Sequence, residues 1–261
     1  MKKLLFVVVL LLPLLALAQS PFDGTWKIDL NKVQLPKKPD VYKLENGKYA
    51  CDSCAPKYEV AADGQNQKVT GHPYFDTIAV KAVDDHNVEM TYQRGEKTVF
   101  AEEYAISNDG KTLKVSWTDT GQPSGGPING NITETRTGKA PSSGNALTGS
   151  WRAEKFDENA DTGLLYSFKA EGADTLSMST PTGQSYTAKV DGTDAPYTGD
   201  PGITSVSLKR IGDYSIEETD KRDGKLISVT RMTVAPDGKT MSVVVEDKLH
   251  GTTTKFVALK Q

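Results

Sequence analysis

The sequence predicts an all-β protein that folds into two tandem antiparallel meander barrels. Three observations predict this class. Apolar residues mostly alternate with polar ones, and turn-forming dipeptides separate the alternating stretches. The two halves of the chain also resemble each other at one constant sequence offset. Alternation with a period of two is typical of strands that bury one face. Repeated tight turns between such strands favour a meander.

Alternating apolar residues mark strands in both halves of the chain. Ile78 and Val80 alternate with polar or small residues, and Val206 and Leu208 do the same 128 positions later. Further alternating sets are Val88, Met90 and Tyr92; Leu113, Val115 and Trp117; Ile227, Val229 and Arg231; and Met241, Val243 and Val245. After Gln19 no dozen residues show a helical period, so only short helical turns are expected, near Asn31-Lys32 and near 159–161.

Asn-Gly and Asp-Gly dipeptides separate these strands, and both supply the positive φ that tight hairpins need. They occur at 46–47, 63–64, 109–110, 191–192, 223–224 and 237–238. We expect seven or eight strands in each half. A meander of that size removes its exposed edges by closing into a barrel, and a sandwich is the alternative for the same number of strands.

An internal duplication accounts for the two halves. The segment around Trp26 resembles the segment around Trp151, at an offset of 125, and from Thr70 onward an offset of 128 holds for about fifty residues. We therefore expect a first barrel at 22–137, a linker of small and polar residues at 138–147, and a second barrel at 148–261. One merged sheet system is the alternative.

The N-terminus has the three parts of a secretory signal peptide. Met1-Lys2-Lys3 is cationic, residues 4–15 are almost wholly apolar, and Ala16-Leu17-Ala18 forms a cleavage site. We predict cleavage after Ala18, so that the signal peptide spans 1–18, and a mature protein in the periplasm or the medium. The apolar run is shorter than the ~20 residues of a membrane-spanning helix, and no stable membrane span is expected.

Composition excludes several function classes. The chain has 37% hydrophobic and 25% charged residues, which excludes a disordered or an integral membrane protein, and its net charge of −3 makes a nucleic-acid partner unexpected. The three histidines form no metal-binding spacing, and the sequence has no nucleophile elbow and no phosphate-binding loop before a helix. We therefore expect no catalytic residues, no cofactor and no metal. The pairs Glu102-Glu103 and Glu217-Glu218 are interpreted as solvated faces. An enzymatic function stays open, but the sequence does not favour it.

Each half opens with a Gly-x-Trp motif. Gly24-Thr25-Trp26 and Gly149-Ser150-Trp151 stand where the first strands begin. A Trp there can plug the end of a small barrel, and a cation from the last strand can cover the ring. Arg136 and Lys260, near the ends of the two copies, are the candidate cations. These six residues, Gly24, Trp26, Gly149, Trp151, Arg136 and Lys260, are predicted to close the barrels.

Gly-x-Trp on the first strand of a hairpin-rich barrel resembles the lipocalin, or calycin, pattern. More narrowly, the chain resembles secreted bacterial lipocalin-like proteins that open with Gly-Thr-Trp-Lys, some of them duplicated. The usual Thr-Asp-Tyr turn is not evident, and each copy is shorter than a typical lipocalin. The resemblance implies a lipocalin-like barrel that binds a small apolar or amphipathic molecule, and it names neither the ligand nor its contact residues.

Cys51 and Cys54 are the two cysteines, and the second copy has no equivalent. A structural disulfide is favoured because the predicted compartment is oxidising. A redox-active dithiol, a zinc site completed by His72, His86 or an acidic residue, free thiols and pairing with another protein remain alternatives.

The sequence therefore favours a non-catalytic extracytoplasmic module that binds a small apolar or amphipathic ligand. The alternative is a cell-envelope structural module that contacts a protein or glycan through sheet edges or the loops at 34–41 and 121–130. A third reading is a Cys-x-x-Cys redox protein.

Overall fold

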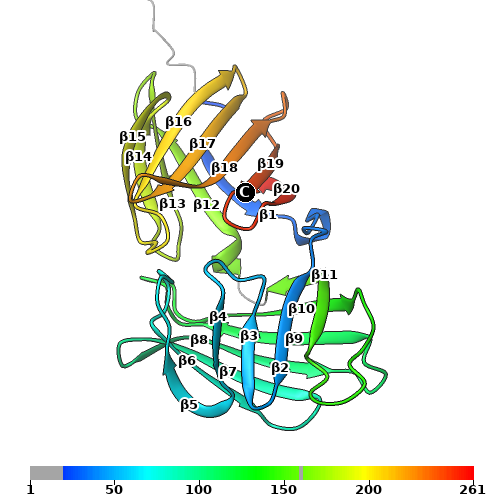
Figure 1. Cartoon of the computed structure of the whole chain (residues 1–261). Helices are drawn as coiled ribbons and strands as arrows, with labels where there is room; N and C mark the ends of the chain where they lie inside the picture. The colour runs from blue at the N-terminus through cyan, green and yellow to red at the C-terminus, as the bar shows by residue number, and fades with distance from the viewer. Residues whose placement is uncertain (1–19, 159–160) are drawn as a thin grey trace, which may run out of the picture.

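The computed structural model describes residues 20–158 and 161–261, and these residues form two antiparallel β-barrels (Figure 1). The predicted signal peptide at 1–18 lies outside the described residues. Two short 3-10 helices, η1 (Leu30–Lys32) and η2 (Asp161–Leu164), are the described helices. In these residues no helix combines the length and apolar character that crossing a bilayer would require.

Barrel 1 is a ten-stranded sheet with the order β4-β3-β2-β11-β10-β9-β8-β7-β6-β5. Its strands are β2 (Asp40–Glu45), β3 (Lys48–Cys51), β4 (Tyr58–Ala61), β5 (Asp63–Lys68), β6 (Thr77–Ala82), β7 (Asn87–Arg94), β8 (Lys97–Ile106), β9 (Thr112–Asp119), β10 (Ile128–Arg136) and β11 (Gly149–Glu158). The two end strands, β4 and β5, follow each other in the chain but are not hydrogen-bonded partners, so barrel 1 is nearly closed.

Barrel 2 is a closed barrel with the order β1-β12-β13-β14-β15-β16-β17-β18-β19-β20. Its strands are β1 (Gly24–Ile28), β12 (Leu165–Ala170), β13 (Thr175–Ser179), β14 (Ser185–Lys189), β15 (Asp191–Thr198), β16 (Ser205–Gly212), β17 (Ser215–Arg222), β18 (Lys225–Val234), β19 (Thr240–Asp247) and β20 (Thr252–Lys260).

The predicted class, two all-β meander barrels, is confirmed, but each barrel has ten strands instead of seven or eight. The additional strands are short: β3 and β4 have four residues each, and β13 and β14 have five. A strand of four or five residues shows too few alternations to stand out in a sequence.

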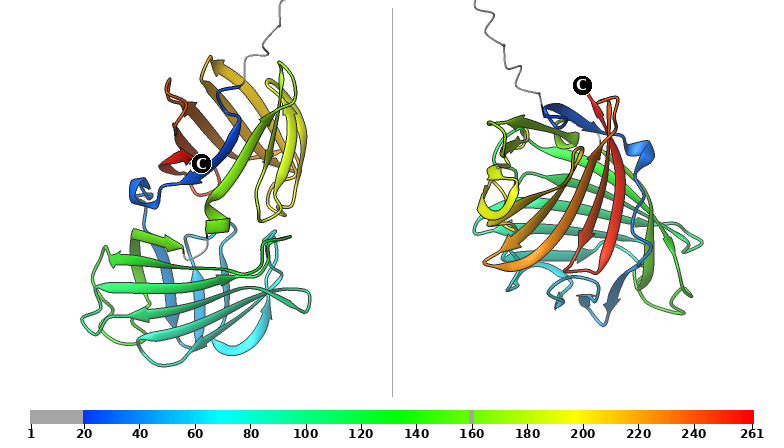
Figure 2. Two further views of the ribbon diagram at one scale, coloured as in Figure 1. Left: turned by 180° about the vertical axis from the view of Figure 1, so that it is seen from behind. Right: turned by 90° about the horizontal axis from the view of Figure 1, so that it is seen from above.

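The first strand of each copy lies in the other barrel. β1 pairs with β12 and β20 of barrel 2, whereas β11 pairs with β2 and β10 of barrel 1. In Figure 1 the blue β1 lies beside the red β20, and Figure 2 shows the same arrangement from behind and from above. The predicted boundaries at 22–137 and 148–261 therefore separate the two copies but not the two barrels.

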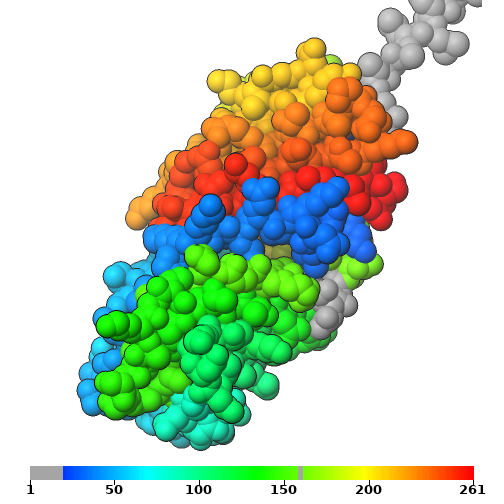
Figure 3. All heavy atoms as spheres, turned by 90° about the vertical axis from the view of Figure 1, so that its right-hand side faces the viewer, coloured from blue at the N-terminus to red at the C-terminus, as the bar shows by residue number. Residues whose placement is uncertain are grey.

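The predicted linker at 138–147 does not connect the barrels either. Its C-terminal end packs into barrel 1: Leu147 is fully buried, and Asn145 Nδ2 donates a hydrogen bond of 2.8 Å to the carbonyl of Asp84. The chain crosses between barrels elsewhere, once between β1 and β2 and once between β11 and β12. Figure 3 shows the first of these segments, in blue, between the red strands of barrel 2 and the green strands of barrel 1.

Matching strands in the two barrels keep the offset of 128. β7, β8 and β9 begin and end at the positions that this offset gives for β17, β18 and β19. Each barrel has its own core, centred on residues such as Ile78 and Leu113 in barrel 1 and Val206 and Met241 in barrel 2. Equivalent places in the two lumens can therefore be compared residue by residue.

Candidate functional site

One end of each barrel is closed by a buried tryptophan with a cation above it. Trp151 and Trp26 are fully buried, and each indole Nε1 donates a 2.8 Å hydrogen bond to a carbonyl four residues earlier, Leu147 and Phe22 respectively. The Arg136 guanidinium lies 4.0 Å from the Trp151 ring centroid, and Lys260 Nζ lies 5.4 Å from that of Trp26. Because β1 and β11 are exchanged, each cation covers the tryptophan of the other copy.

The glycine of each Gly-x-Trp motif makes room for that cation. Gly24 and Gly149 have φ values of +120° and +145°, which side chains rarely adopt. A Cβ on Gly24 would lie 2.7 Å from Lys260 Cε, and one on Gly149 would collide with the Arg136 guanidinium. Arg136 also donates to the carbonyls of Gly110, Thr148 and Ala146. Its five fixed donors thus tie the closed end of barrel 1 together.

The opposite ends of the barrels face each other. In an antiparallel meander alternate connections lie at the same end, so the β13–β14, β15–β16, β17–β18 and β19–β20 connections share one end of barrel 2. Residues from three of these connections, and Arg222 at the end of β17, line a cavity of about 470 Å³ together with the open end of barrel 1. The cavity is therefore the mouth of barrel 1, covered by the connections of barrel 2.

The wall of this cavity is mainly aromatic. Tyr58, Phe75, Tyr92 and Phe100 line it, together with His72. The rings contact one another in sequence, with centroid separations of 6.2 Å for Tyr58–Phe75, 4.9 Å for Phe75–Tyr92 and 5.8 Å for Tyr92–Phe100. The interplanar angles of these three pairs are 65–77°, so the ring edges and faces alternate around the wall.

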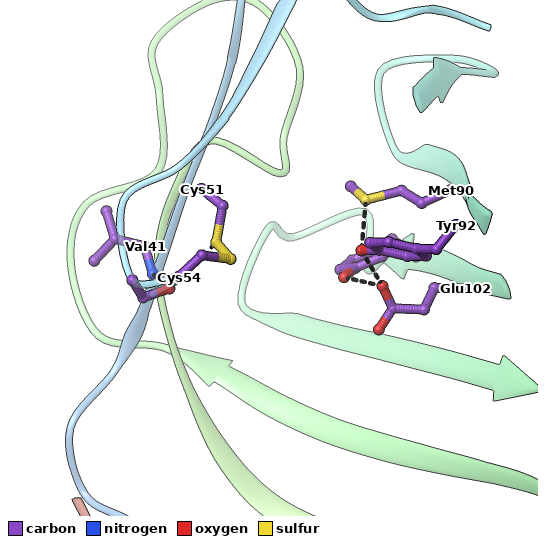
Figure 4. The surroundings of a disulfide bond; sticks show 8 residues. Val41, Cys51, Cys54, Met90, Tyr92 and Glu102 are labelled. Carbon is purple, nitrogen blue, oxygen red and sulfur yellow. Dashed lines mark hydrogen bonds between the residues drawn. A yellow bond between two sulfur atoms is a disulfide. The ribbon is translucent and has the colours of Figure 1, made fainter. Parts of the chain in front are cut away.

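A carboxylate, Glu102, lies among these rings. Its Oε2 accepts hydrogen bonds from Tyr92 Oη at 2.7 Å and Tyr104 Oη at 2.9 Å. Among the described residues its other oxygen, Oε1, has no hydrogen-bond donor. Burial raises the pKa of Glu102, and the two phenol hydrogen bonds oppose that rise. Figure 4 shows Tyr92 between Met90 and Glu102.

Two further carboxyl groups lie near Glu102 in barrel 1. Glu134 is 3% exposed, and its Oε2 has no hydrogen-bond partner among the described residues. Burial, with added repulsion from Asp40 and Glu102, raises the pKa of Glu134 to about 8. Burial also raises the pKa of Asp40. The lumen of barrel 1 is thus acidic.

Cys51 and Cys54 are joined by a disulfide bond at the end of β3. Cys54 and the following Ala55 line the cavity, so the bridge holds one side of the mouth. Figure 4 shows the disulfide apart from Tyr92 and Glu102, on another part of the wall. His72 lies 5.2 Å from Tyr58 and 4.7 Å from Phe75, ring centroid to ring centroid. No group of three or more His, Cys, Asp or Glu side chains in the described ranges is arranged to hold a metal ion.

The loops that cover the mouth are held by contacts between barrels. Gln184 Nε2 donates to Gln122 Oε1 at 2.6 Å, and Ser124 Oγ donates to the Pro181 carbonyl at 2.8 Å. From the other side, Lys38 Nζ donates to the His250 carbonyl at 2.5 Å. Residues of the loops at 34–41 and 121–130, which the alternative prediction offers as partner-binding surfaces, thus contact barrel 2.

The interpretation of the glutamate pairs as solvated faces was wrong for one member of each pair. Glu103 is exposed and Glu217 pairs with Arg231, but Glu102 and Glu218 point into the lumens. The sequence contains a pattern that indicates the inward side chain. Glu102 lies two residues before Tyr104 and four before Ile106, and side chains two residues apart on a strand share one face.

The lumen of barrel 2 holds a pair of carboxyl groups, Glu218 and Asp220. Glu218 accepts a hydrogen bond from Tyr186 Oη, and Asp220 Oδ2 accepts one of 2.6 Å from Ser228 Oγ. Asp220 is 4% exposed, and its Oδ1 has no partner in the described part of the chain. Burial raises the pKa of Glu218 to about 8, with added repulsion from Asp220, and it raises the pKa of Asp220 to about 6, with added repulsion from Asp200.

No protein-family model matches this chain, and no curated protein is similar to it at a significant level. Its all-β, barrel-like fold is compatible with a lipocalin-like barrel. A function for this chain therefore has to be inferred from the geometry of the cavity.

Proposed function

We propose that the protein is a non-catalytic binding module for a small apolar or amphipathic molecule, held in the mouth of barrel 1. The observation that carries this proposal is the aromatic-walled cavity of about 470 Å³. Small-molecule sites are concave, mostly apolar and about 300–1,000 Å³ in volume, with a few polar groups that orient the ligand.

The construction of the site supports binding over catalysis. Strands carry three of the four rings, the disulfide holds one side of the mouth, and hydrogen bonds between the barrels keep the cover in place. Glu102 has two phenol donors but no neighbouring nucleophile or imidazole in hydrogen-bond contact among the described residues, and a catalytic acid or base normally needs such a partner. We also propose that the protein is a lipocalin-like binding protein.

We also propose that the protein acts outside the cytoplasm. The signal-like sequence of residues 1–18 and the Cys51–Cys54 disulfide support this, because disulfides persist in oxidising compartments. The proposed cleavage after Ala18 predicts a mature chain that starts at Gln19, which N-terminal sequencing of the exported protein would test.

The binding function is tested with N-phenyl-1-naphthylamine, a neutral apolar probe whose fluorescence rises in a dry site. We expect saturable binding of one probe per chain. Val99 lines the cavity, so Val99→Trp would fill it and reduce probe affinity at least tenfold. Ile227 occupies the matching place on β18 of barrel 2, away from the cavity, and Ile227→Trp is the control.

Two results would reject the proposal. One is the absence of saturable probe binding to the wild-type protein. The other is equal probe affinity for the wild type and a folded Val99→Trp variant, since the probe would then lie outside the cavity.

A further inference from the structure

The cavity in the mouth of barrel 1 combines an acidic floor with an aromatic wall. Glu102 lies on β8 five residues beyond Lys97, where that strand begins at the rim, which is about 16 Å at about 3.3 Å per residue. Its carboxylate is thus deep in the mouth, below Phe100 and beside Tyr92. The apolar rings lie between this carboxylate and the solvent.

The charges are divided between the floor and the rim. At the rim, Arg94 and Arg222 are accompanied by Asp119 and Asp200, so cations and anions are both present. On the floor Glu102 faces the cavity, and Asp40 is close enough for its negative charge to raise the pKa of Glu102. A negatively charged ligand head would meet like charge there, whereas a cation would meet only attraction.

The polar groups on the floor have free acceptor capacity. Both phenol donors converge on Oε2 of Glu102, and the described residues supply no donor to Oε1. Buried oxygens are normally paired, so Oε1 of Glu102 has the capacity to accept a hydrogen bond from a ligand.

We infer that the ligand of this cavity is a lipophilic amine cation, with an apolar or aromatic body along the ring wall and one ammonium group at Glu102. This inference rests on the proposed binding function. The ammonium supplies the donor that Glu102 Oε1 lacks and forms a charge-assisted hydrogen bond with this oxygen. The rings of the wall that turn a face toward the cavity attract the same positive charge.

The test compares three ligands that differ only in their polar end: 4-phenylbutylamine, 4-phenylbutan-1-ol and 4-phenylbutanoate. Affinities are measured at pH 7.5 by calorimetry and by displacement of N-phenyl-1-naphthylamine. We expect the amine to bind the wild-type protein at least tenfold more tightly than the alcohol, and the carboxylate to bind more weakly than the alcohol.

Glu102→Gln keeps the side-chain shape and removes the charge. We expect this variant to lose the preference for the amine, with at least a tenfold loss of amine affinity and less than a twofold change for the alcohol. Glu103→Gln is the control, because Glu103 is the next residue on β8 and is exposed on the outer face. Near-ultraviolet circular dichroism checks that both variants remain folded.

The outcomes separate this inference from the proposed function. Equal binding of amine and alcohol by the wild type, or a preserved amine preference in Glu102→Gln, would overturn the cation inference while leaving the binding function intact. Tighter binding of the carboxylate would overturn it in the same way. Failure of all three ligands and of the naphthylamine probe would overturn the binding function and the inference together.

Discussion

The two barrels share a meander of ten strands but differ in what fills the lumen. At the offset of 128, Tyr92 and Phe100 of barrel 1 correspond to Asp220 and Ser228 of barrel 2. In barrel 1 this pair forms a ring contact of 5.8 Å beside the cavity, and in barrel 2 it forms a hydrogen bond of 2.6 Å. The strand framework tolerates either interior, so the side chains of a few inward positions decide which barrel offers a site.

The closed ends differ less than the lumens. Both have a buried tryptophan whose indole donates to a carbonyl, and both have a glycine under a cation. Barrel 1 has an arginine with three carbonyl acceptors, whereas barrel 2 has a lysine farther from its ring. The conserved construction of the plugs indicates that they serve folding of both barrels, and the divergent lumens indicate different roles.

The largest effect is expected from the tryptophan plugs, which also test the strand exchange. Trp26→Ala and Trp151→Ala should each lower the free energy of unfolding by about 4 kcal/mol, because each removes a fully buried indole. Hydrogen exchange should then show loss of protection in β16–β19 for Trp26→Ala and in β7–β10 for Trp151→Ala. Loss of protection in β7–β10 upon Trp26→Ala would mean that each copy keeps its own first strand.

The second largest effect is a dependence of the free energy of unfolding on pH, caused by the buried carboxyl groups. A carboxyl group whose pKa is raised by folding stabilises the protein fully below its unfolded pKa of about 4, and this stability is lost as the pH rises through the raised value. Glu134, with a pKa of about 8, and the pair in barrel 2 should therefore make the free energy of unfolding fall between pH 5 and pH 9.

Glu218→Gln should reduce the fall in the free energy of unfolding between pH 5 and pH 9 by on the order of 2 kcal/mol, because an amide carries no charge to desolvate. Urea denaturation at pH 5, 7 and 9 measures this free energy. Glu217→Gln is the control on the same strand, because Glu217 pairs with Arg231 on the outer face. An unchanged pH dependence in Glu218→Gln would show that the pair in barrel 2 is hydrated.

The smallest effect sharpens the comparison of the two lumens. Phe100→Ser gives barrel 1 the residue that barrel 2 has at this place, and it should weaken binding of N-phenyl-1-naphthylamine about tenfold, or about 1.4 kcal/mol, through loss of a ring from the wall. Fluorescence titration measures it. Ser228→Ala in barrel 2 should leave the affinity unchanged, and an equal loss in both variants would place the probe between the barrels.

Much of this architecture can be predicted from the chain. Period-two alternation is a local property, and sets such as Leu113 with Val115 and Met241 with Val243 lie on strands with buried inner faces. The strand exchange could not be predicted. Gly24-Thr25-Trp26 and Gly149-Ser150-Trp151 are nearly interchangeable, and either strand satisfies the same neighbours, so alternation is the same in both arrangements.

The cavity was missed for a different reason. Glu102 was judged by its charge, although its parity with Tyr104 and Ile106 indicates an inward side chain. The rings of the wall come from β4, β7, β8 and the β5–β6 connection, and no local pattern reports that these rings meet. Only the curvature of the nearly closed sheet of barrel 1 brings them together.

The position of β1 between β12 and β20 sets a constraint on how the molecule is made. As synthesis proceeds from the N-terminus, β1 gains one neighbour when β12 is made, but barrel 2 cannot close until β20 has also been added. Barrel 1 has all its strands once Glu158 has been added, so it can form while barrel 2 is still incomplete. Before β20 is added, the aromatic wall of barrel 1 is therefore present, but the cover that the β19–β20 connection gives to its mouth is not.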